Sequence, residues 1–137
     1  MSSKKIVVQR AVMEIFNKKN LAAIDDFISE NIVDHSAPEG LPAGIEGYRM
    51  KVTAFVEAFP DLNISYSHQI AEGDMVAGRF TLTGTHKGDF VGIAATGKKI
   101  SVTGHDQLRV KEEKIAEHWV EMDMLGMMQQ LGVIATA

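Results

Sequence analysis

Residues 62–70, LNISYSHQI, alternate between mostly apolar side chains at even positions and polar side chains at odd positions. A period of two is typical of a β-strand, because successive side chains of a strand point to opposite faces of the sheet. Residues 74–88, 98–111 and 114–124 are also predicted strands, joined by short turns rich in glycine and charged residues. The second half of the chain therefore predicts an antiparallel meander.

The first half of the chain has a helical period instead. Apolar residues recur at three- and four-residue spacing in residues 4–20 and 45–59, and a shorter helix is predicted over residues 21–30. Residues 31–38 are predicted to be extended, and residues 125–134 to form a final helical turn or two. Helices followed by a meander predict an α+β fold, in which a strongly curved, cone-shaped sheet wraps around the N-terminal helices.

Composition and length limit the class of protein. A chain of 137 residues, 45% apolar and 23% charged, predicts one globular domain spanning residues 1–137. The net charge of −4, with no cluster of Lys or Arg, argues against a nucleic-acid surface. No apolar run reaches the roughly 20 residues that span a bilayer, so we expect no membrane segment and a cytoplasmic location.

The residue types present in the chain also indicate which cofactors it could bind. The chain has no cysteine, which excludes disulfides and thiolate chemistry. Histidine, aspartate and glutamate are present without the spacing of a recognisable metal motif, so we expect neither a metal nor another cofactor.

Alternation divides the predicted strands after residue 74 into two faces. One set is polar: Arg79, Thr81, Thr83, His105, Gln107, Arg109, Trp119, Glu121 and Asp123. The other is mainly apolar: Phe80, Leu82, Leu108, Val120 and Met122, with Asp106 and His118 among them. Either the apolar face packs on the helices and the polar face meets water, or the polar set lines a cavity and a partner subunit covers the apolar face. Alternation alone leaves both arrangements open.

Several strings, taken in order, resemble one known family. They are DHSAPEG at 34–40, AFPDL at 58–62, AEGDMV at 71–76, GTHKGDFVGI at 84–93, TGKKISVTGHDQLRV at 96–110 and KIAEHWVEMDMLGMMQQLG at 114–132. Together they are similar to the SnoaL-like polyketide cyclase (ester cyclase) family of the nuclear-transport-factor-2-like superfold. The resemblance runs from about Asn31 to Gly132 and implies the same α+β fold, whereas the superfold itself hosts several reactions.

The resemblance also implies a site. It places the general acid/base on the last long strand, at Asp123, and substrate contacts at His105 and Gln107, with His35 at the mouth of the pocket. Around Asp123 we expect Phe55 and Phe59 as apolar neighbours and Trp119 as a wall. An inward Arg79 is expected to pair with Glu121 or Asp123, because a guanidinium cannot lose its charge when buried.

This site predicts an intramolecular aldol ring closure on a small hydrophobic, aromatic or polyketide-like ligand. A carboxylate in an apolar pocket is a stronger base, because desolvation raises its pKa. Two other classes remain open: a hydrolase or isomerase of the same superfold, and a non-catalytic ligand carrier. Asp123 could also be a structural ion-pair partner of Arg79 or Arg109.

If the polar set lines the cavity, the opposite face of the sheet is too apolar to leave in water. Phe80, Leu82, Val120 and Met122 would form a large exposed patch there. This arrangement predicts a homodimer joined through that face.

Overall fold

The computed structural model describes residues 3–135, and its helices lie mainly before the sheet in the chain. Helix α1 (Lys4–Ala11) continues into a π-helical segment (Val12–Asn17), and a 3₁₀ turn (Leu21–Ala23) leads into α2 (Ile24–Phe27). The longest helix is α3 (Gly44–Ala58). It ends before Pro60, which cannot continue a helix, and α4 (Met124–Leu131) follows the last strand.

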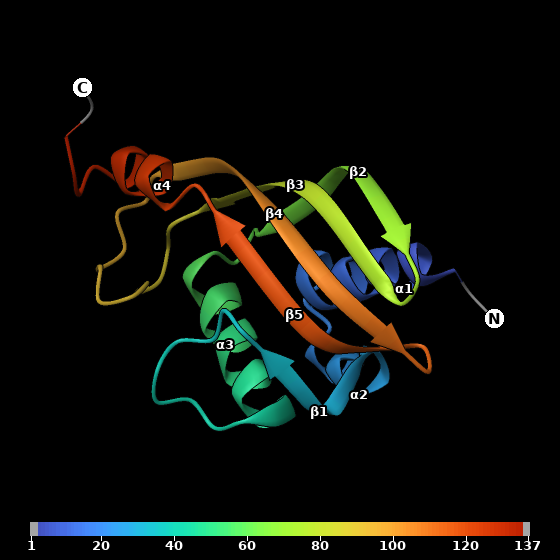
Figure 1. The fold of residues 1–137 in the computed structure, drawn as a ribbon. Coiled ribbons are helices and arrows are strands. Elements are labelled where there is room, and N and C mark those ends of the chain that lie inside the picture. The colour runs from blue at the N-terminus through green and yellow to red at the C-terminus, as the bar shows by residue number, and fades with distance from the viewer. Residues whose placement is uncertain (1–2, 136–137) are drawn as a thin grey trace.

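Within residues 3–135 the sheet has five strands, in the order β1-β5-β4-β3-β2. These are β1 (Ile28–Asp34), β2 (Asn63–Glu72), β3 (Met75–Thr85), β4 (Lys99–Lys111) and β5 (Lys114–Met122). Strands β2 to β5 form the predicted antiparallel meander, and β1 pairs in parallel with β5. The sheet curves over α1 and α3 without closing (Figure 1). The predicted α+β fold is confirmed.

Strand β1 begins inside a segment that the sequence predicts to be helical. The helix ends at Phe27, and Ile28 is already extended and paired with Ile115 of β5. The prediction of a helix through residue 30 is therefore wrong at its end. Pairing with a strand far away in the sequence overrides the local helical period there.

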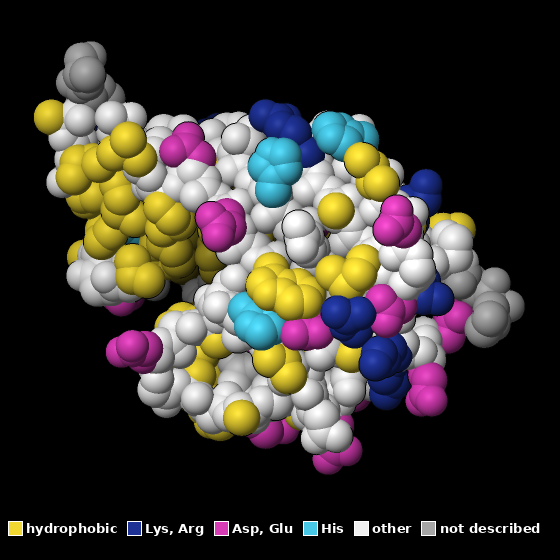
Figure 2. Space-filling view, viewed as in Figure 1, with side chains coloured by type: hydrophobic (Ala, Val, Ile, Leu, Met, Phe, Trp, Pro, Cys, Tyr) yellow, Lys and Arg dark blue, Asp and Glu magenta, His cyan; other side chains and the backbone are white. Residues whose placement is uncertain are grey.

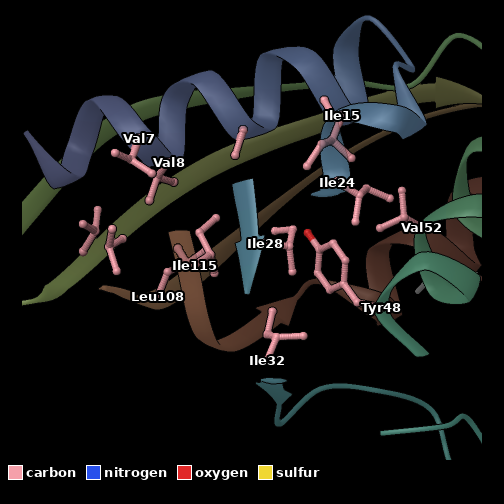
Figure 3. Packing of buried hydrophobic residues seen from close by; sticks show 14 residues of the cluster. Val7, Val8, Ile15, Ile24, Ile28, Ile32, Tyr48, Val52, Leu108 and Ile115 are labelled. Atoms are coloured by element: carbon pink, nitrogen blue, oxygen red, sulfur yellow. The ribbon is translucent and has the colours of Figure 1, made fainter. Parts of the chain in front are cut away.

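Two groups of buried side chains fill the space between the helices and the sheet. The first joins α1, α2 and β1 to the part of the sheet that contains Val76, Val110 and Ile115, and in Figure 3 Tyr48 of α3 lies beside Ile28 of β1. The second is built around Phe59, Phe80 and Met127, at the end of the sheet next to α4. Among the described helices, none is long and apolar enough to cross a membrane.

The apolar face of the sheet is the inner one. On β4, Gly104, Asp106 and Leu108 are buried, while His105 and Gln107 between them are exposed. The polar set therefore lies on the outer face, and of the two arrangements left open by the sequence, the one in which this set lines the interior cavity is wrong. The hydrophobic effect decides the orientation, because the inner face can be covered by the helices of the same chain.

The surface predicted to join a homodimer also lies on the inner face of the sheet. Phe80 and Leu82 are buried, and Val120 and Met122 pack against the same core from inside. These four side chains cannot form a patch on the outside of the molecule. Homodimer formation stays a prediction, but the surface from which it was predicted is buried within the chain.

The alternation in β2 is interrupted. The pairing of β2 with β3 shifts between Tyr66 and His68, which marks a β-bulge. Ile64 and Tyr66 pack against the core, but beyond the bulge Ile70 turns outward and is 68% exposed. The even-numbered residues of 62–70, which the sequence predicts on one face of the sheet, therefore change face at the bulge.

Phe59 offers a test of the core beside α4. Its side chain is fully buried and its ring lies 5.6 Å from that of Phe55 and 5.3 Å from that of Phe90. Replacing Phe59 by Ala should lower the free energy of unfolding by about 3–5 kcal/mol, through lost burial and the cavity left behind. Phe55→Ala is the matched control and should cost less in urea unfolding, because Phe55 is only partly buried. Equal losses would contradict this account.

Candidate functional site

The inner face of the sheet, α3 and the loop after β3 enclose a cavity of about 430 Å³. Its wall is mostly apolar, with side chains such as Phe55, Phe80 and Leu108. Figure 2 shows hydrophobic side chains gathered near α4 and the loop after β3, a region where Val91 and Leu125 are exposed. The polar and charged residues on the wall are Ser36, Tyr48, Lys51, Tyr66, Asp89, Asp106 and His118.

Asp106 is the carboxylate set deepest in this wall. It lies on the inner face of β4 and is only 7% exposed. Its Oδ2 accepts a hydrogen bond from the Tyr66 hydroxyl of β2, while its Oδ1 is buried and has no hydrogen-bond partner within residues 3–135. Burial raises the pKa of Asp106 to about 6, although bonds from Tyr66 and from the backbone act in the opposite direction.

The Tyr66 hydroxyl keeps its proton at ordinary pH. Burial, and then the neighbouring charge of Asp106, raise the pKa of Tyr66. Tyr66 is therefore a permanent hydrogen-bond donor to one oxygen of Asp106, and the other oxygen is left as an acceptor without a partner.

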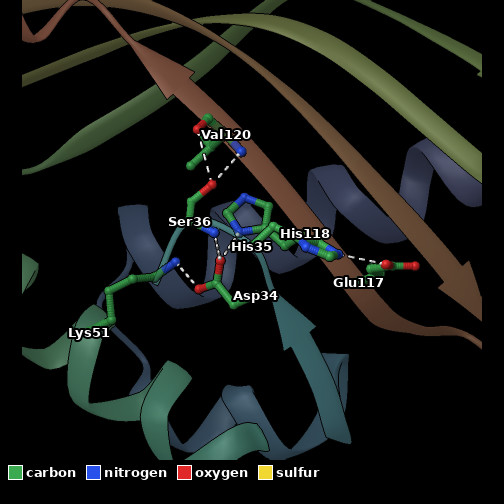
Figure 4. A network of polar contacts seen from close by, with 7 residues as sticks. All are labelled: Asp34, His35, Ser36, Lys51, Glu117, His118 and Val120. Carbon is green, nitrogen blue, oxygen red and sulfur yellow. Dashed lines mark hydrogen bonds and ion pairs between the residues drawn. The ribbon is translucent and has the colours of Figure 1, made fainter. Parts of the chain in front are cut away.

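A second polar group lies on the same wall, where β1 runs beside β5. The backbone N–H of His35 donates to the carbonyl of His118 at 2.9 Å, and the Ser36 hydroxyl donates to the carbonyl of Val120 at 3.0 Å. These bonds hold the end of β1 against β5 and place Asp34 beside His118 (Figure 4).

Asp34 sits between a cation and an imidazole. One carboxylate oxygen binds the ammonium of Lys51 from α3, and the other lies 3.4 Å from Nδ1 of His118 and accepts the Ser36 N–H at 3.0 Å. Burial alone would raise the pKa of Asp34, but His118 and Lys51 lower it well below its ordinary value. Burial lowers the pKa of His118, and Asp34 offsets part of that effect. Asp34 is thus ionised and His118 neutral near pH 7.

Tyr48 of α3 completes this corner of the cavity. Its ring meets that of His118 edge to face at 6.5 Å, and the Lys51 ammonium lies 5.2 Å from its ring centre. Burial, followed by the charges of Asp34 and Asp106, raises the pKa of Tyr48, so it too is an uncharged hydroxyl.

Asp123 lies elsewhere than expected. Its side chain is exposed and caps the N-terminus of α4, accepting a hydrogen bond from the Gly126 N–H at 2.9 Å. The prediction that it lies deep in the cone is wrong, because the chain has already left the sheet at Met122 and begins a helix whose free N–H groups need an acceptor.

The predicted substrate contacts on the strands also lie outside. His105, Gln107 and Glu121 are exposed, and Arg79 is paired across the strands with His105 on the same outer face. Arg79 therefore does not point inward. The outer face is hollowed into an open depression of about 560 Å³ that includes His105, Gln107, Trp119 and Glu121.

His35 packs outside the cavity as well. It stacks on Trp119 with ring centres 4.6 Å apart, and its Nε2 lies 2.7 Å from a carboxylate oxygen of Glu117. Of the residues predicted from the sequence, Phe55 lines the cavity, and Phe59 is buried in the adjoining core.

Sequence reasoning thus missed Asp106, His118, Tyr66 and Lys51. A signal for the first two was present, because they are polar residues at positions of the apolar set. A polar group that interrupts an apolar strand face must be buried, and burial of such a group calls for a partner or a function. Among the described residues, no cluster of three His, Asp or Glu side chains is arranged to hold a metal ion.

Comparison with known proteins identifies the family. Residues 6–131 match the family model described as SnoaL-like polyketide cyclase. The chain is 29% identical over 133 residues to aklanonic acid methyl ester cyclase DnrD of Streptomyces peucetius. The match covers 95% of this chain and 92% of that protein.

Solved structures agree with this match. TsrD from Streptomyces laurentii has a TM-score of 0.85 at 26% identity, covering 97% of this chain and 100% of its own. AclR from Streptomyces galilaeus, described as a candidate hydroxylase, has a TM-score of 0.84 at 30% identity, covering 98% of this chain and 83% of its own. Since the family model spans nearly all of the sequence, this chain belongs to the SnoaL-like polyketide cyclase family.

Proposed function

We propose that this protein is a lyase-type cyclase, which closes a ring in a polyketide-like ester by an intramolecular aldol reaction with Asp106 as general acid and base. The observation that carries the proposal is a carboxylate oxygen that is buried, unpartnered and set in an apolar cavity. The name of DnrD, a cyclase of aklanonic acid methyl ester, supports this substrate class.

The chemistry follows from the position of Asp106. Its free Oδ1 takes a proton from a carbon that flanking carbonyl groups make acidic, and the resulting enolate carbon attacks a second carbonyl of the same molecule. The new alkoxide then takes the proton back from Asp106. A carboxyl group with a pKa near 6 is suited to both transfers near neutral pH.

The rest of the cavity contributes binding and orientation. Tyr66 holds the carboxylate by its other oxygen. Tyr48 offers a neutral hydroxyl on the same wall, a suitable donor to an enolate oxygen. The aromatic and aliphatic walls exclude water and hold the folded substrate, which supplies the proximity contribution to the rate.

The superfold's other reactions fit the cavity less well. An epoxide hydrolase of the Asp-Arg-Asp type needs an arginine beside its catalytic acids. Arg79 lies on the outer face of the sheet, and Arg109 is bound to Asp74 and Glu117 there. Along the described part of the cavity wall, Lys51 is the only Lys or Arg side chain. A ligand carrier would share the cavity but would show no turnover.

The assignment of the base is tested by Asp106→Asn, with aklanonic acid methyl ester as the first substrate. We expect turnover to fall by roughly 100-fold or more, because the amide cannot take the proton. Stability at pH 8 should be at least that of the wild type, because ionising the buried carboxylate costs the folded state about 3 kcal/mol, as judged from its raised pKa.

Asp123→Asn is the matched control. Asn also caps helices well, so both stability and turnover should stay close to wild type. Loss of turnover in Asp123→Asn together with full activity in Asp106→Asn would overturn the assignment. An inactive wild type that still binds the ester would favour a carrier.

The pH dependence gives an independent test. A base must be ionised, so kcat/KM should be low at about pH 5, rise through an apparent pKa of about 6 and level off above about pH 7. Tyr66→Phe removes a hydrogen bond that favours the ionised form, so its rising limb should move to higher pH. A flat profile from about pH 5 to 8 would contradict Asp106 as the base.

A further inference from the structure

His118 lines the cavity, and its neighbours determine which of its two ring nitrogens carries the proton. Its ring lines the cavity, and its Nδ1 is buried 3.4 Å from Asp34 Oδ1. That distance is longer than a good hydrogen bond, so the carboxylate orients the ring chiefly through its charge.

The charge state of Asp34 fixes which nitrogen carries the proton. An ionised carboxylate can only accept, so the imidazole nitrogen that faces it is the protonated one. Lys51 and the Ser36 N–H both bind Asp34, and His118 and Lys51 lower its pKa and keep it ionised although its side chain is only 7% exposed. In a neutral ring with the proton on Nδ1, the other nitrogen, Nε2, carries a lone pair.

Nε2 is the ring nitrogen that a ligand can reach. Nδ1 is turned to Asp34 but forms no hydrogen bond with it, and Nε2 on the other side of the ring also has no hydrogen-bond partner in the described part of the chain. The unpartnered Oδ1 of Asp106 lies on the wall of the same cavity and is also an acceptor. The cavity thus offers acceptors that an apolar ligand would leave unsatisfied.

We propose that Asp34 and Lys51 are positioning residues that hold His118 with Nε2 as an acceptor, and that the ligand of this cavity donates a hydroxyl group, phenolic or enolic, to that nitrogen. The inference rests on the proposed function for the location of the ligand, and it adds a requirement that the aldol chemistry does not impose. A ligand whose hydroxyl is methylated, or replaced by a carbonyl, loses the bond and leaves Nε2 unpaired.

A matched pair of probes tests the ligand requirement without turnover. 2-Naphthol and 2-methoxynaphthalene differ only in the donor, and both are flat apolar molecules suited to the cavity. At pH 7.5 the wild type should bind 2-naphthol about fivefold or more tightly than the ether, as measured by fluorescence titration. His118→Phe should remove this preference and keep the affinity for the ether.

The Asp106→Asn variant shows whether the hydroxyl is accepted by Nε2 of His118 or by Oδ1 of Asp106. The preference should persist in this variant if His118 accepts the hydroxyl. Equal binding of both probes by the wild type, or a preference that survives in His118→Phe and vanishes in Asp106→Asn, would overturn the proposal. Neither result depends on cyclase activity, so a failure here is distinct from a failure of the proposed function.

The positioning role has a spectroscopic test. Long-range ¹H–¹⁵N spectra of the wild-type protein should show His118 as the neutral tautomer with hydrogen on Nδ1. The charged and titratable groups around the ring are Asp34 of β1, Tyr48 and Lys51 of α3, and Asp106 of β4 on the shared wall. In Lys51→Met the charge of Asp34 acts on the ring without compensation, so the pKa of His118 should rise. A wild-type tautomer with hydrogen on Nε2, or an unchanged His118 titration in Lys51→Met, would contradict the assignment.

Discussion

Burial of the inner face of the sheet is the constraint on which the rest of this structure depends. Strands β3 to β5 each carry one mainly apolar face, and α1, α3 and α4 cover that face from within the same chain. The curved sheet and its helices do not fill the enclosed volume, and the remainder is the cavity of about 430 Å³. The same hydrophobic burial that stabilises the fold therefore also makes the binding site.

The polar groups in this cavity are held in two separate ways. Asp106 accepts a hydrogen bond from Tyr66 on one oxygen and has no partner for the other among the described residues, and its burial raises its pKa. Asp34 is surrounded by Lys51, His118 and a backbone N–H, so its charge is compensated. These different surroundings are the basis for proposing Asp106 as the group that exchanges protons and Asp34 as the group that orients His118.

Family membership and site geometry answer different questions. The match over residues 6–131 and the superposition on TsrD establish the fold and the family. AclR, described as a candidate hydroxylase, shares that fold, so the fold alone does not select a reaction. The choice of a cyclase rests on the carboxylate in the cavity, and the inferred need for a hydroxyl donor rests on Asp34 and His118.

The sequence alone determined most of the helices and the antiparallel meander, because helical and strand periods are local properties of the backbone, and its ordered strings indicated the family. It could not decide which face of the sheet is inner, since both alternation patterns are equally regular. The resemblance placed the base at Asp123, which caps a helix, and the undecided orientation of the sheet left Asp106, which faces the cavity, unrecognised. Only the tertiary structure brought Asp34 of β1 beside His118 of β5, because their parallel pairing joins segments far apart in the chain. Side-chain period is set locally, whereas burial and the pKa changes that follow from it depend on contacts that only the folded chain makes.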